Sequence, residues 1–131
     1  YVGCAFEIAD QAADMGIDFD WIVMATGSTG TQAGLVAGFA ALGGTPPVMG
    51  VSVRQPRDKQ IDAVFGLASR TLVKLGGDGL TKDSIHVDDG YVGDGYGIPA
   101  PSTLAAIVDR QRSSTAARTS ARHSGRRCSW R

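Results

Sequence analysis

One stretch near the start of the chain, residues 21–42, limits the possible folds more than any other. It begins with a short apolar run, Trp21–Ala25, which has the length of a buried strand and is rich in residues that favour β-structure. The loop Thr26–Thr31 follows, and it contains only Thr, Gly and Ser, small residues that permit a tight turn. Apolar residues then recur at helical spacing from Leu35 to Leu42. The stretch therefore predicts a strand, a glycine-rich turn and a helix that starts at the turn.

A helix that starts at such a loop favours an anion at its first turn. The first N–H groups of a helix have no partner within the helix, and the helix dipole attracts negative charge to that end. The hydroxyls of Ser28, Thr29 and Thr31 add possible donors. The loop lacks the Gly-Lys-Ser/Thr ending of a nucleotide P-loop and the strict G-x-G-x-x-G dinucleotide pattern. We interpret it as a phosphate site, and the alternative is that its glycines serve only a tight turn.

The remaining apolar patterns predict an open α/β fold. Helical spacing occurs over residues 4–15 and from Ile61 to Leu75, and short strands are expected over residues 48–53 and 85–87. A last helix is expected to begin near Ser102 and to bury three apolar side chains, Leu104, Ile107 and Val108. Strands that alternate with helices indicate a mainly parallel, three-layer sheet. Gly34 and Gly38 give the helix after the loop a face of small residues, which we expect to pack on this sheet.

Charge divides the chain into two parts. Residues 1–109 hold all 13 acidic residues and six basic ones, whereas residues 110–131 hold seven Arg and no acid. The second part also lacks Leu, Ile and Val, so its composition predicts a disordered basic tail. Our hypothesis is a shift of reading frame near codons 109–113, which translation of the other two frames would test. The alternative is a genuine tail that binds nucleic acid, which the absence of Lys from it disfavours.

Other features argue against membrane spans and metal sites. No apolar run approaches the roughly 20 residues of a membrane helix. The two cysteines, Cys4 and Cys128, lie at opposite ends without metal-binding spacing, and a cytoplasmic location is the default expectation. The acidic residues of 88–94 lack the spacing of a calcium loop, so we expect turn residues there and no metal.

Several separated motifs together resemble one family of enzymes. They occur in a single order: Gly3–Ala9, Phe19–Val23, Ala25–Gly38, Gly50–Val53 and Asp88–Pro99. This set resembles the D-cysteine desulfhydrase and 1-aminocyclopropane-1-carboxylate deaminase family, whose members depend on pyridoxal phosphate and have the tryptophan-synthase-β type of fold. The resemblance covers residues 1–109 and implies a partial large domain, as a C-terminal-half fragment of a longer protein.

The resemblance also implies roles for individual residues. The loop resembles the family's phosphate cup, which assigns the cofactor phosphate to Gly27, Ser28, Thr29, Gly30 and Thr31. Tyr96 matches the family's active-site tyrosine, which lies near cofactor and substrate, and it is the expected catalytic residue. Tyr91 is expected to be structural, and a loop aromatic without a catalytic role is the alternative interpretation of Tyr96.

The family's chemistry requires a lysine that forms a Schiff base with the cofactor. In relatives that lysine lies upstream of these motifs. This chain has only Lys59, Lys74 and Lys82, and their polar surroundings predict surface roles. We therefore expect the isolated chain to be inactive.

For the intact parent, the resemblance implies an enzyme that converts a small amino acid, such as D-cysteine, to a keto acid, ammonia and sulfide. 1-Aminocyclopropane-1-carboxylate deaminase and cysteate sulfo-lyase activities are the alternatives within the family. A homodimer is expected for the parent, with no membrane or nucleic-acid partner. A non-catalytic module that binds a phosphate ligand is the alternative from another class.

Overall fold

The structure, a computed structural model, describes residues 1–123. Its elements are α1 (Val2–Met15), β1 (Ile22–Thr26), α2 (Thr29–Ala41), β2 (Val48–Ser52), α3 (Arg57–Lys74), the short 3-10 helix η1 (Lys82–Ser84), β3 (His86–Asp88) and α4 (Pro101–His123). The chain divides after Tyr96, so that α1 to β3 form a first compact unit and α4 belongs to a second. All elements predicted from the apolar patterns are present, and apart from the end of α4 their bounds differ from the expected ones by a few residues.

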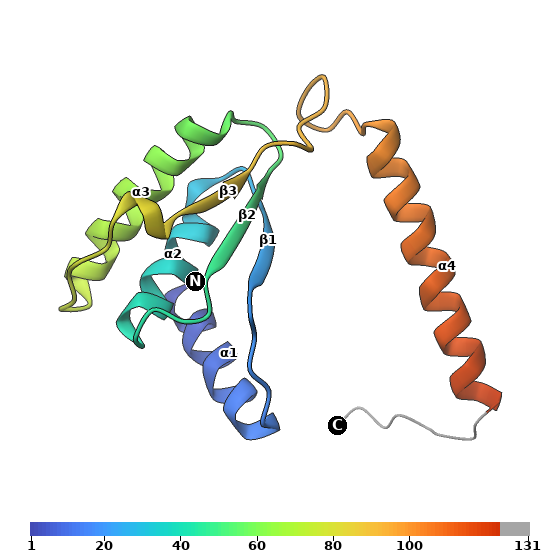
Figure 1. Ribbon diagram of the computed structural model, residues 1–131, viewed down its shortest axis with the longest axis horizontal. Coiled ribbons are helices and arrows are strands. Elements are labelled where there is room, and N and C mark those ends of the chain that lie inside the picture. The colour runs from blue at the N-terminus through green and yellow to red at the C-terminus, as the bar shows by residue number, and fades with distance from the viewer. Residues whose placement is uncertain (124–131) are drawn as a thin grey trace. The chain divides into compact units, whose positions relative to one another are not determined.

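The three strands form one parallel sheet in the order β1-β2-β3 (Figure 1). In the register of the sheet, Gly50 of β2 lies between Met24 of β1 and Val87 of β3. The predicted α/β class and the parallel pairing are therefore confirmed. Because parallel strands end at the same edge, the segments that follow β1, β2 and β3 all leave the sheet on one side.

The core of the first unit lies between one face of the sheet and its helices. Helix α2 packs against both α1 and α3, and the three helices lie to one side of the strands (Figure 1). The buried apolar cluster includes Phe39 of α2, Val48 and Val87 of the sheet, and Val64 of α3. The other face of the sheet is more open within this unit, as shown by Val23 of β1, which is 65% exposed.

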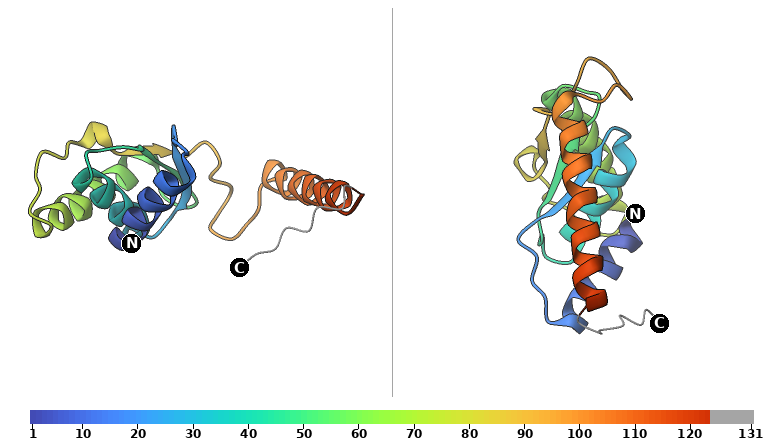
Figure 2. Two further views of the ribbon diagram at one scale, coloured as in Figure 1. Left: turned by 90° about the horizontal axis from the view of Figure 1, so that it is seen from below. Right: turned by 90° about the vertical axis from the view of Figure 1, so that its right-hand side faces the viewer.

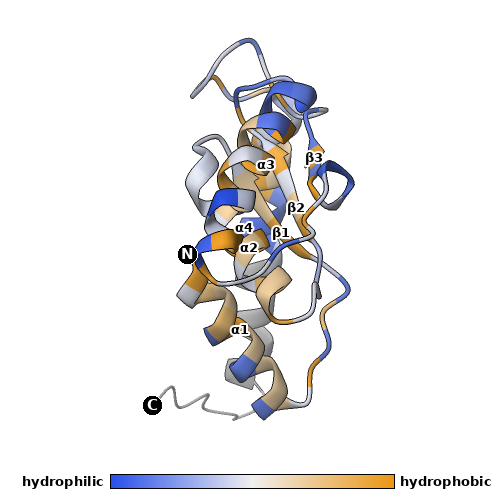
Figure 3. Cartoon of the chain, turned by 90° about the vertical axis from the view of Figure 1, so that its left-hand side faces the viewer, coloured by the Kyte–Doolittle hydropathy of each residue, from blue (hydrophilic) through white to orange (hydrophobic). Residues whose placement is uncertain are grey.

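Local sequence signals set the helix ends. Helix α1 carries hydrophilic and hydrophobic residues on different sides (Figure 3), and it ends at Gly16, which adopts a left-handed conformation with φ 64°. Helix α3 ends at Lys74 with Leu75 as its C-cap, and Gly76, whose φ is 83°, follows. Left-handed backbone of this kind is strained for residues with a side chain, so glycine at these two positions determines where each helix stops.

The small-residue face of α2 packs on α1 instead of on the sheet, which corrects our expectation. A Cβ added to Gly38 would lie 2.5 Å from the Cβ of Ala5, and one added to Gly34 would lie 2.7 Å from the Cβ of Tyr1. The two helix backbones are therefore close enough that only glycine fits. The sequence could not show this contact, because a face of small residues suits a helix neighbour as well as a sheet.

Helix α4 is one uninterrupted helix that passes the expected boundary at residue 110 (Figure 2). This differs from the predicted disorder for residues 110–123, and the physical reason is that Ala, Arg and Gln are good helix formers even without apolar periodicity. Residues 124–131 of the predicted tail lie outside the described residues. Leu104, Ile107 and Val108 are 51%, 51% and 44% exposed, not buried as expected, because the second unit contains no other described element to cover them. Within residues 1–123, α4 included, no helix has both the length and the apolar character needed to cross a membrane.

The contact between α1 and α2 predicts opposite effects for two glycine-to-alanine changes. Gly38→Ala should lower the free energy of unfolding by about 1–2 kcal/mol, because overpacking of about 1–3 kcal/mol exceeds the gain in helix propensity of up to about 1 kcal/mol. Gly66→Ala in α3 is the control, since its nearest atom would lie at 3.7 Å. It should raise the free energy of unfolding by about 0.5–1 kcal/mol. Urea unfolding followed by circular dichroism measures both, and equal effects of the same sign would contradict this packing.

Candidate anion site at the start of helix α2

The loop between β1 and α2 presents unpaired backbone donors. Ser28 is the N-cap residue, with extended backbone angles of φ −86° and ψ 131°, and its hydroxyl makes no capping hydrogen bond. Helix α2 starts at Thr29, and no acidic residue occupies its first turn. The N–H groups of this turn therefore have no helical acceptor, and the positive end of the helix dipole is not neutralised by a neighbouring carboxylate. This arrangement attracts an anion such as a phosphate group.

The two glycines of the loop have different roles. A Cβ on Gly27 would lie 2.7 Å from Cγ2 of Val53, so glycine is required there for close packing against the segment that follows β2. A Cβ on Gly30 would meet no atom within 4 Å. The space beside Gly30 is therefore open, and a ligand can approach the backbone of the first turn from that side.

Buried hydrogen bonds hold the neighbouring segments in place at the same edge of the sheet. The fully buried Thr26, at the end of β1, accepts a hydrogen bond of 2.8 Å from Nε2 of Gln60 in the first turn of α3. The backbone N–H of Val53 donates to the carbonyl oxygen of Thr26 at 3.0 Å. After β2, the hydroxyl of Ser52 donates to the carbonyl oxygen of Gln55 at 2.6 Å. The residue that precedes the loop, Thr26, is thus held by hydrogen bonds to both α3 and the segment after β2.

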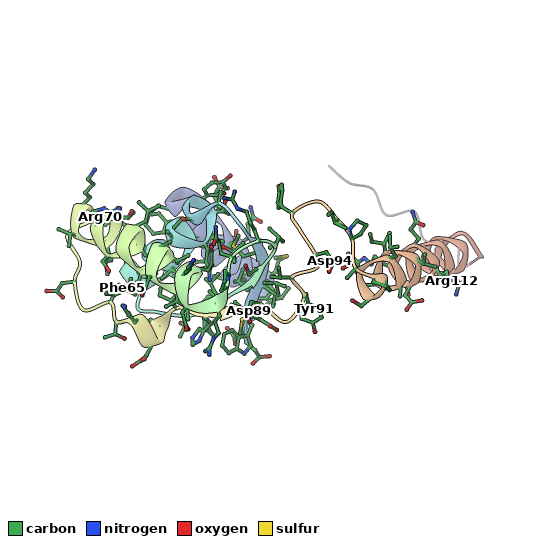
Figure 4. All side chains as sticks on the ribbon, turned by 90° about the horizontal axis from the view of Figure 1, so that it is seen from above. Phe65, Arg70, Asp89, Tyr91, Asp94 and Arg112 are labelled. Atoms are coloured by element: carbon green, nitrogen blue, oxygen red, sulfur yellow. The ribbon has the colours of Figure 1, made fainter. Side chains whose placement is uncertain are left out.

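The segment after β3 is attached to the start of α3. Oδ2 of Asp89 accepts the backbone N–H of Arg57 at 2.8 Å, and Nε of Arg57 donates to the carbonyl oxygen of Val87 at 3.1 Å. Figure 4 shows Asp89 beside the end of α3 where the helix begins. Asp88 accepts the N–H of Gly90 at 2.8 Å, as expected for a turn residue. Sequence reasoning missed the capping role of Asp89, because the two partners lie 32 positions apart.

The predicted site residues are only partly brought together. Residues 27–31 form one continuous turn at the start of α2. Tyr96 belongs to the loop after β3, and its side chain is 74% exposed, so its role stays a prediction. Tyr91, on the same loop (Figure 4), is 64% exposed.

The three lysines lie at the surface of the first unit. Lys82 pairs with Asp62 at 2.5 Å, and both side chains are more than half exposed. Lys59 and Lys74 belong to α3 and are exposed. These positions agree with the surface roles expected from the sequence.

Gln32 is a further residue of the first turn of α2 that the sequence analysis did not single out. Its side chain is fully buried, although Gln is usually exposed. The available signal was its position, since Gln32 precedes Val36 and Phe39 by four and seven residues and so lies on the same side of the helix as these two residues.

The contact between Asp89 and Arg57 predicts a measurable capping effect. Asp89→Ala should lower the free energy of unfolding by about 1 kcal/mol, because the first N–H of α3 loses its acceptor. Asp89→Asn keeps an oxygen acceptor and should retain most of the stability. Urea titration of the three proteins makes the comparison, and equal losses in both variants would show that the hydrogen bond is not the cause.

Comparison with known proteins gives one family match and a consistent set of relatives. The family described as "Pyridoxal-phosphate dependent enzyme" matches residues 1–115. A 1-aminocyclopropane-1-carboxylate deaminase of Ralstonia nicotianae is 38% identical over 109 residues, which cover 82% of this chain and 32% of the relative. The enzymes of the same name from Burkholderia cenocepacia and Variovorax paradoxus are 37% and 36% identical over similar ranges. The chain thus spans about a third of the length of the curated relatives that it matches, 32% in each case.

Proposed function

The chain belongs to the family of pyridoxal-phosphate dependent enzymes, and from this premise we propose that the loop before α2 binds the phosphate of that cofactor. The observation that carries the proposal is the first turn of α2, where no side chain caps the helix and a Cβ added to Gly30 would meet no atom within 4 Å. Phosphate groups bind well to such helix starts. The α/β fold with its parallel sheet is that of part of a tryptophan-synthase-β type domain.

The residues present fit a phosphate group. Ser28 has a hydroxyl that is not used for capping, and Thr29 and Thr31 supply two more. Together with the backbone N–H groups of the first turn, these hydroxyls would bind and orient the phosphate. Bound in this way, pyridoxal phosphate supplies an electron sink that makes the α-proton of an amino acid acidic. The contribution of this segment is to hold the cofactor at one end.

We propose that the enzyme acts on a small amino acid, with two leading candidates. The names of the relatives support 1-aminocyclopropane-1-carboxylate deaminase. The spacing of the loop motif, Ala25–Gly34, favours D-cysteine desulfhydrase, and cysteate sulfo-lyase is a third possibility. A cytoplasmic homodimer is the assembly we propose for the whole enzyme.

Tyr96 is proposed to lie near the cofactor and substrate in the whole enzyme. Its loop begins at the edge of the sheet that also bears the anion site, and Asp89 attaches the start of this loop to α3. An exposed tyrosine there is available to contact a substrate.

The isolated chain is proposed to bind phosphate compounds without turnover. None of its three lysines belongs to the loop before α2, and Lys82 is engaged by Asp62. Incubation with pyridoxal phosphate and either D-cysteine or 1-aminocyclopropane-1-carboxylate tests this. Release of sulfide or ammonia by the chain alone would refute the proposed inactivity.

If the loop binds phosphate, a negative charge at position 30 should weaken binding of the anion without lowering the stability of the fold. Gly30→Asp introduces a carboxylate where a side chain meets no other atom, and unit charges about 5 Å apart interact by roughly 3 kcal/mol at an effective dielectric constant near 20. We expect at least about a tenfold loss of affinity for deoxypyridoxine phosphate, an analogue without the aldehyde, measured by equilibrium dialysis. Stability should stay equal or rise by about 0.3–1 kcal/mol, because an acidic residue favours a helix start.

Gly30→Ala is the matched control, because it adds a methyl group without a charge, and it should lose less affinity than Gly30→Asp. Unchanged binding by Gly30→Asp would contradict a phosphate site at this turn.

A chimera tests the substrate class and Tyr96. Residues 1–109 of this chain would replace the aligned segment of the Ralstonia relative. We expect the chimera to bind cofactor and to release ammonia from 1-aminocyclopropane-1-carboxylate or sulfide from D-cysteine. Tyr96→Phe in the chimera should lower kcat by about tenfold or more if the hydroxyl takes part in proton transfer. Full activity of this variant would show that Tyr96 is a loop aromatic whose hydroxyl has no catalytic role.

A further inference from the structure

The side chain of Gln32 connects the first turn of α2 to the far strand of the sheet. Its Nε2 donates a hydrogen bond of 2.8 Å to the backbone carbonyl oxygen of His86, 54 residues away in β3. The side chain is fully buried, so this bond forms away from water. The carboxamide passes over β2, because it lies next to Gly50 of that strand while its acceptor belongs to β3.

Gly50 makes this crossing possible. It lies on β2 beside Val87 of β3, and a Cβ added to it would lie 2.6 Å from both Cδ and Nε2 of Gln32 and closer still to Oε1. Its φ is not in the left-handed region, so the backbone conformation does not require glycine. The reason for glycine at this position is the space that the carboxamide of Gln32 occupies.

The carboxamide carries a cost that local packing does not explain. Oε1 of Gln32 is buried and has no hydrogen-bond partner among the described residues. A buried polar atom without a partner is destabilising, and an apolar side chain of the same length would avoid that cost. An apolar side chain at position 32 would therefore avoid the cost of the unpaired Oε1. Only a polar side chain, however, can form the hydrogen bond to His86.

We propose that Gln32 is a positioning residue for the phosphate site, and this inference rests on the function proposed above. The first turn of α2 would bind phosphate through several N–H groups at once, so a small tilt of the turn changes all of these distances together. The bond from Gln32 to β3 fixes the turn against the sheet on one side. On the other side, Thr26 is fixed by Gln60 of α3.

The test compares two variants of the full chain that each lose one hydrogen bond. Gln32→Met keeps the length of the side chain and removes the donor to His86. Thr71→Val is the matched control, because it removes the bond from Oγ1 of Thr71 to the carbonyl oxygen of Leu67 within α3. The dissociation constant of inorganic phosphate is measured at a temperature where both variants are folded by circular dichroism. We expect Gln32→Met to weaken phosphate binding about 3- to 10-fold and Thr71→Val to leave it unchanged.

A second variant tests the pairing with Gly50. Gly50→Ala should also weaken phosphate binding, because the added methyl group displaces the carboxamide. In Gly50→Ala/Gln32→Ala the methyl group no longer meets the carboxamide, so the combined loss of affinity should be smaller than the product of the losses measured in Gly50→Ala and in Gln32→Ala. Multiplicative losses would overturn the link between Gly50 and the phosphate site.

The outcomes separate this inference from the proposed function. Phosphate binding by the parent chain with an unchanged dissociation constant in Gln32→Met overturns the role of Gln32 and leaves the phosphate site intact. Failure of the parent chain to bind phosphate overturns the proposed function. Amide hydrogen exchange at Ala33–Val36 then tests the anchor itself, and equal exchange in Gln32→Met and the parent would overturn it.

Discussion

The burial of α2 is the constraint on which the rest of the first unit depends. Every residue from Gln32 to Phe39 is buried, because α1, α3 and the sheet surround this helix. A helix can be enclosed in this way only if its neighbours come close, and the glycines at 34 and 38 permit the contact with α1. The apolar character of the segment matches this environment, since a helix that is apolar on all sides is typical of a protein interior.

The N-terminal turn of α2 is the part of this buried helix that reaches the surface, and it lies at the carboxyl edge of the sheet. The enclosed part of α2 fixes the direction of its axis, while the turn at residues 28–31 remains at the surface with its N–H groups unpaired. Thr26, Ser52 and Asp89 each follow or end a strand at this edge, and each is hydrogen-bonded to a segment from elsewhere in the chain or to its own loop. The geometry of the candidate anion site thus follows from how the helix is packed, and the neighbouring polar side chains support the loop.

Local patterns were sufficient to predict the elements, and they also singled out the loop that we propose as the phosphate site. Apolar periodicity marks the helices and strands, Gly16 and Gly76 mark helix ends, and the run of Thr, Gly and Ser marks the turn before α2. Contacts between distant segments could not be predicted in this way. The bonds from Gln32 to β3 and from Asp89 to Arg57 join residues more than 30 positions apart, and nothing in the local pattern distinguishes their partners.

The expected contacts of α4 and of the small residues of α2 were not found, because they depend on which elements pack together, and a local sequence pattern does not show this. The apolar residues of α4 suggested burial, but within their own unit they are exposed, and the helix continues through residues without apolar periodicity. The small residues of α2 suggested a sheet contact, but they pack on α1. The small residues of α2 do form a close contact, but with a different partner, whereas the burial expected for α4 and the disorder expected for residues 110–123 are not found.

The central claim is that the start of α2 binds the phosphate of the cofactor. Mapping of backbone amide shifts by NMR during titration with inorganic phosphate tests it most directly, because each N–H group reports on its own surroundings. We predict saturable shifts centred on Gly27–Thr31, with smaller changes at Val53, which contacts Gly27. Shifts confined to the arginines beyond residue 109, or no saturable shifts at the loop, would contradict it.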